Sequence, residues 1–231
     1  MRILLVCVLL ACITFPAMPK PASFSFLRQA VNLPALRQLA NVMRRPQLLV
    51  PHLSLDALSD LDLAQLRGRG VRVIVFDKDN TLTLTYVDEL HASSRETIAG
   101  AISIFGAHGL AILSNSVGSC DDAGFAGATA TEAALGLPVI RHELKKPSCL
   151  PEVLAHFEQT GRTAGLLPGQ ICMVGDRVLT DVLFANLAGM VSVLVRPLCT
   201  RTDHPVSVLI RAMERRLLLP LLRLLGYGPG K

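Results

Sequence analysis

The chain has 231 residues, a net charge of +5, 51% hydrophobic residues and a mean hydropathy of +0.45. This length suits one ordinary domain with extensions, and the positive charge favours an anionic partner such as a nucleic acid, an anionic lipid or a phosphorylated substrate. The six cysteines include no C-x-x-C pair and have no accompanying histidine cluster, so a zinc site is not expected.

The first 43 residues are expected to be a leader for targeting or membrane association. Residues 3–15, ILLVCVLLACITF, come closest to a transmembrane helix, but 13 residues are too few to span a bilayer. This run is typical of a secretory signal core, although no small-x-small cleavage site follows it. Before Asp56 there are six basic residues and no acidic one, which suits organelle import. Organelle import and secretory or membrane insertion both remain open.

Residues 44–203 are predicted to form a domain in which strands and helices alternate. A short helix is expected within residues 50–70. Strands are then expected at residues 71–77, 110–115, 137–142, 170–176 and 191–197, and helices at residues 93–109, 120–136, 148–161 and 178–190. Ser93 or Ser94 would cap the first of these four helices. The strands are continuously apolar, so the pattern predicts an α/β fold with a parallel sheet covered by helices on both faces.

Polar residues end three of these strands, at the edge where ligands bind in open α/β sheets. Several carboxylates at one edge would repel each other, and a divalent cation relieves that repulsion; oxygen ligands favour Mg²⁺. Hydroxyl, amide and lysine groups suit a phosphoryl group, and an aspartate can form an aspartyl-phosphate. The candidates are Asp77, Asp79, Ser114, Asn115, Lys145, Lys146, Asp176 and Asp181.

Each of these motifs also has an ordinary structural interpretation. Paired aspartates after a strand often form a turn, and Asp176 could simply cap a helix. Lys145 and Lys146 could be a solvated charge pair. The four motifs together, in this order and each at a predicted strand end or helix start, argue against coincidence.

The motifs DKDNT, LAILSN, KKP and GDRVLTD resemble, in order and spacing, those of the haloacid dehalogenase (HAD) superfamily of phosphohydrolases, which implies a Rossmann-like HAD fold. The resemblance implies that Asp77 attacks phosphorus and that Asp79 acts as acid and base. Ser114 and Lys146 would hold the phosphoryl oxygens, and Lys146 is preferred to Lys145 because it directly precedes Pro147. Mg²⁺ would be held by Asp77, the Asp79 carbonyl and Asp176, with Asp181 in support.

A closer resemblance, over residues 44–195, is to the mitochondrial phosphatidylglycerophosphatase family. The segments RRPQLLVPHL, VFDKDNTL, LSNSVGSCDD, GLPVIRHELKKPSC and MVGDRVLTDVLFANLAGM carry it. It implies Mg²⁺-dependent removal of the terminal phosphate of phosphatidylglycerophosphate, which supplies phosphatidylglycerol for cardiolipin synthesis. It also implies a phospholipid substrate and peripheral binding to an anionic membrane on the matrix side of the mitochondrial inner membrane. No nucleic acid partner is expected.

Two alternatives stay open. One is a HAD phosphatase for another bulky phosphomonoester, such as a phosphoprotein or a polynucleotide end. The other is a non-catalytic membrane-binding scaffold on the same fold, against which the presence of Asp77, Asp79, Lys146 and Asp176 argues.

The motif spacing predicts that the domain has no cap. Asp79 and Ser114 are 35 positions apart, and Ser114 and Lys146 are 32 apart; one helix and one strand use most of each interval. The site should therefore be open to bulky substrates. His142 and Arg141 precede the lysines and could border the site, but a surface position is favoured.

Residues 204–231 are predicted to form a basic amphipathic helix, which suits an anionic membrane surface or packing on the domain. Its apolar stripe would hold Leu209, Ile210, Met213 and Leu217, and Pro220 would kink or end it. The basic residues are Arg211, Arg215, Arg216 and Arg223.

Overall fold

A computed structural model describes residues 38, 41–160, 165–199 and 205–228. The chain divides into two compact units: Pro51–Thr202, and a smaller unit that combines Met1–Val50 with Asp203–Lys231. Nearly all of the expected leader, residues 1–43, lies outside the described residues. The boundaries expected at residues 44 and 203 stay a prediction.

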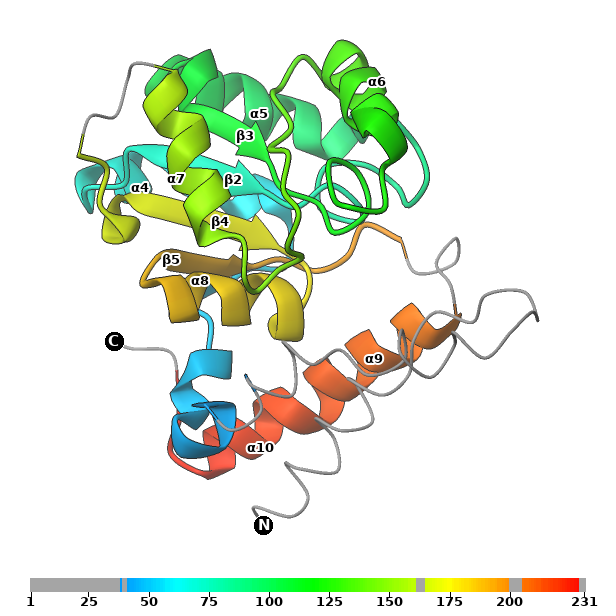
Figure 1. Ribbon diagram of the computed structural model, residues 1–231. Helices are drawn as coiled ribbons and strands as arrows, with labels where there is room; N and C mark the ends of the chain where they lie inside the picture. Colours follow the sequence, from blue (N-terminus) through cyan, green and yellow to red (C-terminus); the bar gives the residue numbers. More distant parts are fainter. Residues whose placement is uncertain (1–37, 39–40, 161–164, 200–204, 229–231) are drawn as a thin grey trace. The chain divides into compact units, whose positions relative to one another are not determined.

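The larger unit is built on a parallel sheet of five strands in the order β1-β5-β4-β2-β3 (Figure 1). The strands are β1 (Leu53–Ser54), β2 (Val73–Phe76), β3 (Leu110–Ile112), β4 (Ile171–Gly175) and β5 (Val191–Leu194). Every residue of β2 and β4 is buried, as expected for strands covered on both faces. The predicted α/β fold with a parallel sheet is confirmed.

Helices cover both faces of this sheet. They are α4 (Leu63–Gly68), α5 (Ala92–Phe105), α6 (Ala126–Leu135), α7 (Leu150–Gln159) and α8 (Leu183–Ala188). Short 3₁₀ turns η2 (Leu58–Asp60), η3 (Ala107–Gly109), η4 (Ala123–Phe125) and η5 (Pro168–Gln170) join them, and a wide π-type turn η6 (Val178–Val182) leads into α8.

The period-two alternation of β2 sorts the core into two layers. Ile74 and Phe76 pack with residues of α4, α5 and α6, whereas Val73 and Val75 pack with residues of α7 and α8. Figure 1 shows α7 and α8 on the near face of the sheet, with α5 behind it. Because helices cover both faces of the sheet, the polar residues that follow the strands lie together at the edge formed by the carboxyl ends of the strands.

Two predicted elements differ from the structure. Residues 137–142 form only an isolated bridge, in which the Ile112 N–H donates to the Pro138 carbonyl (2.8 Å) and the Ile140 N–H donates to the Ile112 carbonyl (2.9 Å). The chain then leaves the sheet, since the His142 N–H donates to the Gly118 carbonyl (2.8 Å). The predicted helix in residues 50–70 is confined to η2 and α4, since Leu53–Ser54 pairs with β5 as an edge strand.

The predicted helix at residues 93–109 also has different ends. It starts at Ala92 with the His91 side chain as cap, not Ser93 or Ser94, and it ends at Phe105 before Gly106. Gly106 has a φ of +76°, a conformation that glycine adopts without strain and that stops the helix.

In the smaller unit, the described residues form the 3₁₀ turn η1 (Pro46–Leu49) and a helical run of α9 (Pro205–Met213), the π-type turn η7 (Glu214–Leu218) and α10 (Leu219–Leu224). Of the two predicted effects of Pro220, an end of the helix is wrong, because the chain stays helical through Pro220. A kink at Pro220 stays a prediction. Pro220 lies in the first turn of α10, where a missing N–H costs little.

The predicted apolar stripe of this helical run is wrong in part. Ile210 is buried, whereas Leu209 and Leu217 are exposed, because Arg211 and Glu214 take places on the buried side. None of the described helices has the length and apolar character needed to cross a membrane.

Candidate active site

The site lies where adjacent strands β4, β2 and β3 end. Asp77 directly follows β2, Asp176 follows β4, and Asp181 lies within η6 just beyond it. One carboxylate oxygen from each of these three residues lies within 4.8 Å of the others, and all three residues are buried. The structure therefore brings together the carboxylates that the sequence placed at separate strand ends.

Lys146 joins two of these carboxylates. Its ammonium group donates to Asp77 Oδ1 (2.7 Å), Asp181 Oδ1 (2.6 Å) and the Leu113 carbonyl (2.9 Å), which uses its three donors. Lys145 instead pairs with Asp121, and both of their side chains are exposed. The geometry therefore places Lys146 in the site and Lys145 outside it.

The charges of this cluster do not balance. Burial raises the pKa of Asp77 to about 6, although the Lys146 ammonium opposes the shift. Burial alone would lower the pKa of Lys146, but Asp181 and Asp77 raise it above its ordinary value, so Lys146 carries its charge. One ammonium faces three carboxylates here. A divalent cation would neutralise the remaining charge, and an all-oxygen donor set fits Mg²⁺.

Both carboxylate oxygens of Asp181 accept hydrogen bonds. Its Oδ1 accepts from Lys146, and its Oδ2 accepts from the Arg177 N–H (3.1 Å). A Cβ atom on Gly175 would lie 2.3 Å from the Asp181 Cγ atom, so only glycine lets this carboxylate sit against β4. With both oxygens engaged, Asp181 fits the supporting role expected of it, while Asp77 and Asp176 fit direct metal ligands.

Asp79 lies at the solvent side of the cluster, with about a quarter of its side chain exposed. The Ser116 hydroxyl lies 3.3 Å from Asp79 Oδ2 and 3.0 Å from the Ser114 hydroxyl, which links the first and second motifs. The sequence reasoning missed Ser116. Its place two residues after Ser114 was the available signal, because both belong to one loop.

Asn115 and His142 contact backbone atoms of residues that form the site. The Asn115 amide oxygen accepts from the Lys146 backbone N–H (2.9 Å), which orients the lysine. The role of Asn115 as a substrate ligand stays a prediction. The ring nitrogens of His142 lie 2.7 Å from the Ser114 carbonyl oxygen and 2.8 Å from that of Leu144. His142 is 2% exposed, so its predicted surface position is wrong. Its neighbours along the chain turn it beneath the loop of the second motif.

Asp122 fixes the far end of that loop. Its carboxylate accepts from the backbone N–H groups of Gly118, Gly127 and Ala128, at 2.8–2.9 Å. Burial raises the pKa of Asp122, but these three hydrogen bonds outweigh burial, and the net pKa is lowered. The second motif is thereby tied to the start of α6.

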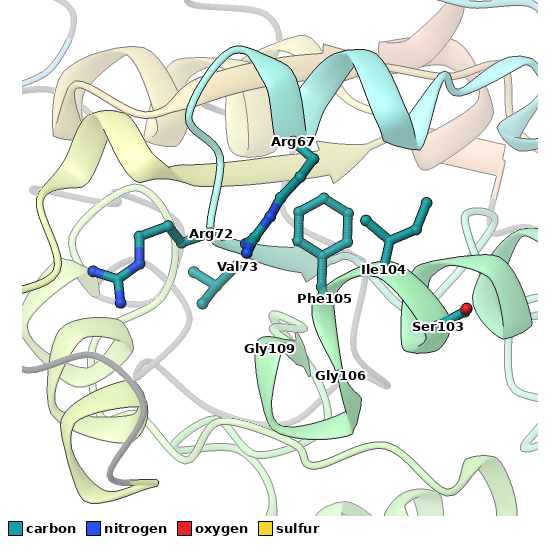
Figure 2. A pocket seen from close by; sticks show the side chains of 8 residues that line it. All are labelled: Arg67, Arg72, Val73, Ser103, Ile104, Phe105, Gly106 and Gly109. Atoms are coloured by element: carbon teal, nitrogen blue, oxygen red, sulfur yellow. The ribbon is translucent and has the colours of Figure 1, made fainter.

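A separate cavity of about 420 Å³ lies at the opposite edge of the sheet, where β2 begins and α5 ends. Figure 2 shows the Arg67 guanidinium beside the Phe105 ring, 5.9 Å from its centroid, with Arg72 across the opening. Neither motif carboxylates nor Lys146 line it. It is therefore distinct from the strand-end site.

A family described as mitochondrial PGP phosphatase matches residues 33–198. The chain is 36% identical over 200 residues to "Phosphatidylglycerophosphate phosphatase 1, chloroplastic/mitochondrial" of Arabidopsis thaliana, covering 85% of this chain and 54% of the relative. It is 41% identical over 172 residues to the chloroplastic phosphatidylglycerophosphate phosphatase 1 of Chlamydomonas reinhardtii, covering 72% and 60%. The chain thus spans little more than half the length of these two relatives.

A third relative is a mitochondrial phosphatidylglycerophosphatase of Saccharomyces cerevisiae, 29% identical over 177 residues, which cover 77% of this chain and 94% of the yeast protein. No solved structure matches the chain. The matched region contains β1–β5 and every carboxylate of the strand-end cluster. The chain belongs to the mitochondrial phosphatidylglycerophosphate (PGP) phosphatase family.

Proposed function

We propose that this protein is a Mg²⁺-dependent phosphatase that converts phosphatidylglycerophosphate to phosphatidylglycerol. The observation that carries the proposal is the placement of Asp77 at the end of β2, bonded to Lys146 and within 4.8 Å of the Asp176 and Asp181 carboxylates. The names of the relatives supply the substrate.

In the first step, an Asp77 carboxylate oxygen attacks the terminal phosphorus while the bond to the glycerol oxygen breaks. Asp79, in its protonated form, gives its proton to the leaving oxygen, so that phosphatidylglycerol departs as an alcohol. The Ser114 hydroxyl holds one phosphoryl oxygen, and the Lys146 ammonium exchanges its hydrogen bond to Asp77 Oδ1 for one to another phosphoryl oxygen. The products of this step are phosphatidylglycerol and an aspartyl-phosphate at Asp77.

In the second step, Asp79, now a carboxylate, takes a proton from a water molecule that attacks the same phosphorus. The bond between phosphorus and the Asp77 oxygen breaks, which releases inorganic phosphate and restores both aspartates. The partial exposure of Asp79 and its hydrogen bond from Ser116 suit a group that meets both water and substrate. A bound Mg²⁺ would offset negative charge on the phosphoryl oxygens, held by Asp77, the Asp79 carbonyl and Asp176.

Asp77→Asn tests the proposal, because the amide keeps the shape of the carboxylate and removes the nucleophile. We expect phosphate release from phosphatidylglycerophosphate to fall by at least about 10³-fold, with urea unfolding showing a folded protein. Chelation of divalent ions should stop the wild-type reaction, and added Mg²⁺ should restore it. Hydrolysis of a phosphopeptide or a polynucleotide 5′-phosphate without hydrolysis of the lipid would favour the bulky-substrate alternative; no hydrolysis at all would favour the scaffold.

We also propose that the α9–α10 helical run binds an anionic membrane surface. Its exposed side carries Leu209, Leu217 and Leu224, with Arg216 and Arg223 also exposed between them. Exposed leucines beside arginines are the pattern of a helix that lies in the plane of a membrane interface. Arg211 is buried, so it is not part of this face.

Arg216→Gln with Arg223→Gln should weaken sedimentation with phosphatidylserine-containing vesicles and leave the weak binding to neutral vesicles unchanged. The exposed Arg69, in the larger unit, offers a matched control as Arg69→Gln. High salt should remove the difference between the variants, because it screens exposed charges. Equal binding by the wild type and the double variant would refute this membrane face.

The relatives named as mitochondrial support a mitochondrial location for this protein. We further propose that it binds peripherally to the matrix side of the inner membrane. Carbonate extraction and protease protection of isolated mitochondria test this. A protein that resists extraction, or one found outside mitochondria, would contradict it.

A further inference from the structure

Five basic side chains lie in or next to the motif segments, and four of them are already paired with carboxylates. Lys146 pairs with Asp77 and Asp181, and Lys145 pairs with Asp121. Two others pair elsewhere: Lys78 with Asp79 and Asp88, and Arg141 with Glu132. These four cations are therefore committed to the fold or to the cluster itself.

Lys78 and Arg141 are held firmly in those roles. The Lys78 ammonium, 3% exposed, also donates to the Val87 carbonyl (3.0 Å) and so fastens the loop after the first motif. Arg141 donates to both oxygens of Glu132 and to the Val139 carbonyl, and the pKa of Glu132 is lowered chiefly by its hydrogen bonds from Arg141. Turning either side chain toward a substrate would break a structural pair.

Arg177 is different. It directly follows Asp176, and its backbone N–H binds Asp181 Oδ2 (3.1 Å), so its Cα atom is fixed at the catalytic edge. Its side chain is half-buried, and within the described part of the chain its Nε atom is buried without a hydrogen-bond acceptor and its guanidinium has no carboxylate partner. Burial of a donor without an acceptor is costly. Since the other four cations are already paired, the half-buried Arg177 guanidinium is the one of these five that can bind an anionic ligand without breaking an ion pair.

We infer that Arg177 binds a second anionic group of the substrate, the phosphodiester that joins the headgroup to the diacylglycerol. This rests on the proposed function, in which Lys146, Ser114 and the metal hold the terminal phosphate. A glycerol bridge separates the two phosphorus atoms, so the phosphodiester lies beside the reacting group rather than on it. A guanidinium presents paired donors that match two phosphate oxygens, which makes Arg177 a specificity residue for a substrate with two phosphates.

Arg177→Gln and Arg177→Lys test this with two substrates: phosphatidylglycerophosphate in detergent micelles, and p-nitrophenyl phosphate, which has no second anion. For Arg177→Gln we expect kcat/KM on the lipid to fall by about 10- to 100-fold, mainly through KM, and activity on p-nitrophenyl phosphate to stay close to that of the wild type. Arg177→Lys should recover part of the loss on the lipid, because it keeps the charge and loses the paired donors.

Lys145→Gln is the matched control, since it removes a nearby charge that is already paired at the surface. It should leave both substrates unaffected. An equal loss on both substrates in Arg177→Gln would show a structural role and overturn the inference, as would no loss on either. A wild type that turns over p-nitrophenyl phosphate but not the lipid would overturn the proposed function first, and this inference with it.

Discussion

The sharpest test of the site's packing is Gly175→Ala, at the end of β4. A Cβ atom there would lie 2.3 Å from Asp181 Cγ, 2.4 Å from Oδ2 and 2.6 Å from Cβ. Ordinary carbon–carbon contacts begin at about 3.5 Å, so Asp181 would have to move by about 1 Å. The Asp181 Cβ atom is among the crowded atoms, so rotation of the carboxylate alone does not relieve the clash.

Two effects should follow from that displacement. Overpacking of a buried site costs about 1–3 kcal/mol of the free energy of unfolding. The 2.6 Å hydrogen bond between Lys146 and Asp181 would also lengthen, which frees Lys146 from the position it holds beside Asp77. A misplacement of about 1 Å in a catalytic group can cost about 10²-fold in rate, so we expect a loss of that order in kcat.

Urea denaturation and hydrolysis of p-nitrophenyl phosphate measure the two effects. Gly169→Ala is the matched control, because the nearest atom to its added Cβ, outside its chain neighbours, is 3.9 Å away. The control should lie within about 0.5 kcal/mol of the wild type and keep full activity. If Gly175→Ala behaves like Gly169→Ala in both assays, the packing argument at Asp181 is wrong.

Three further predictions concern stability. Asp122→Asn should lower the free energy of unfolding by about 1–2 kcal/mol near neutral pH. Because the folded-state pKa of Asp122 is lowered, the stability that its carboxylate contributes is present above the unfolded-state pKa and is lost as pH falls through the folded-state pKa. The urea unfolding curves of the variant and the wild type should therefore converge under acidic conditions. Lys146→Met should lower the free energy of unfolding by about 3–5 kcal/mol, because it leaves buried carboxylates unpaired. Lys145→Met should lower it by less than about 1 kcal/mol. Similar urea midpoints for the two variants would contradict the burial of Lys146 and the exposure of Lys145. Phe157→Ala should cost about 3–5 kcal/mol in a thermal melt, since Phe157 is fully buried between α7 and the sheet, and a smaller shift would indicate a core that collapses around the gap.

The sequence predicted the sheet well because its strands are continuous apolar runs bounded by turn residues. β2, β3, β4 and β5 all lie within the predicted segments. The strand predicted at residues 137–142 is wrong because this segment bridges β3 at one residue pair before the His142 N–H donates to the Gly118 carbonyl. A local apolar pattern does not show where a segment loses its partner strand. The sequence did not predict the edge strand β1, because two residues are too few to show an alternating pattern.

The chain order of the motifs was enough to place Asp77, Asp79, Ser114, Asp176 and Asp181 at one edge of a parallel sheet, because the carboxyl ends of parallel strands share that edge. That much is a consequence of periodicity and connectivity, which sequence carries. The close approach of Asp77, Asp176 and Asp181 within 4.8 Å needed the folded chain.

Only the tertiary structure decided which cation serves which carboxylate. Lys145 and Lys146 are neighbours in sequence, yet one is exposed and the other is buried against Asp77, because the chain between the second motif and α7 turns only one of them inward. The same holds for Lys78, Arg141 and Arg177, whose side chains look equivalent until their partners are known. Ion pairing depends on distances between residues far apart in the chain, and those distances exist only after folding.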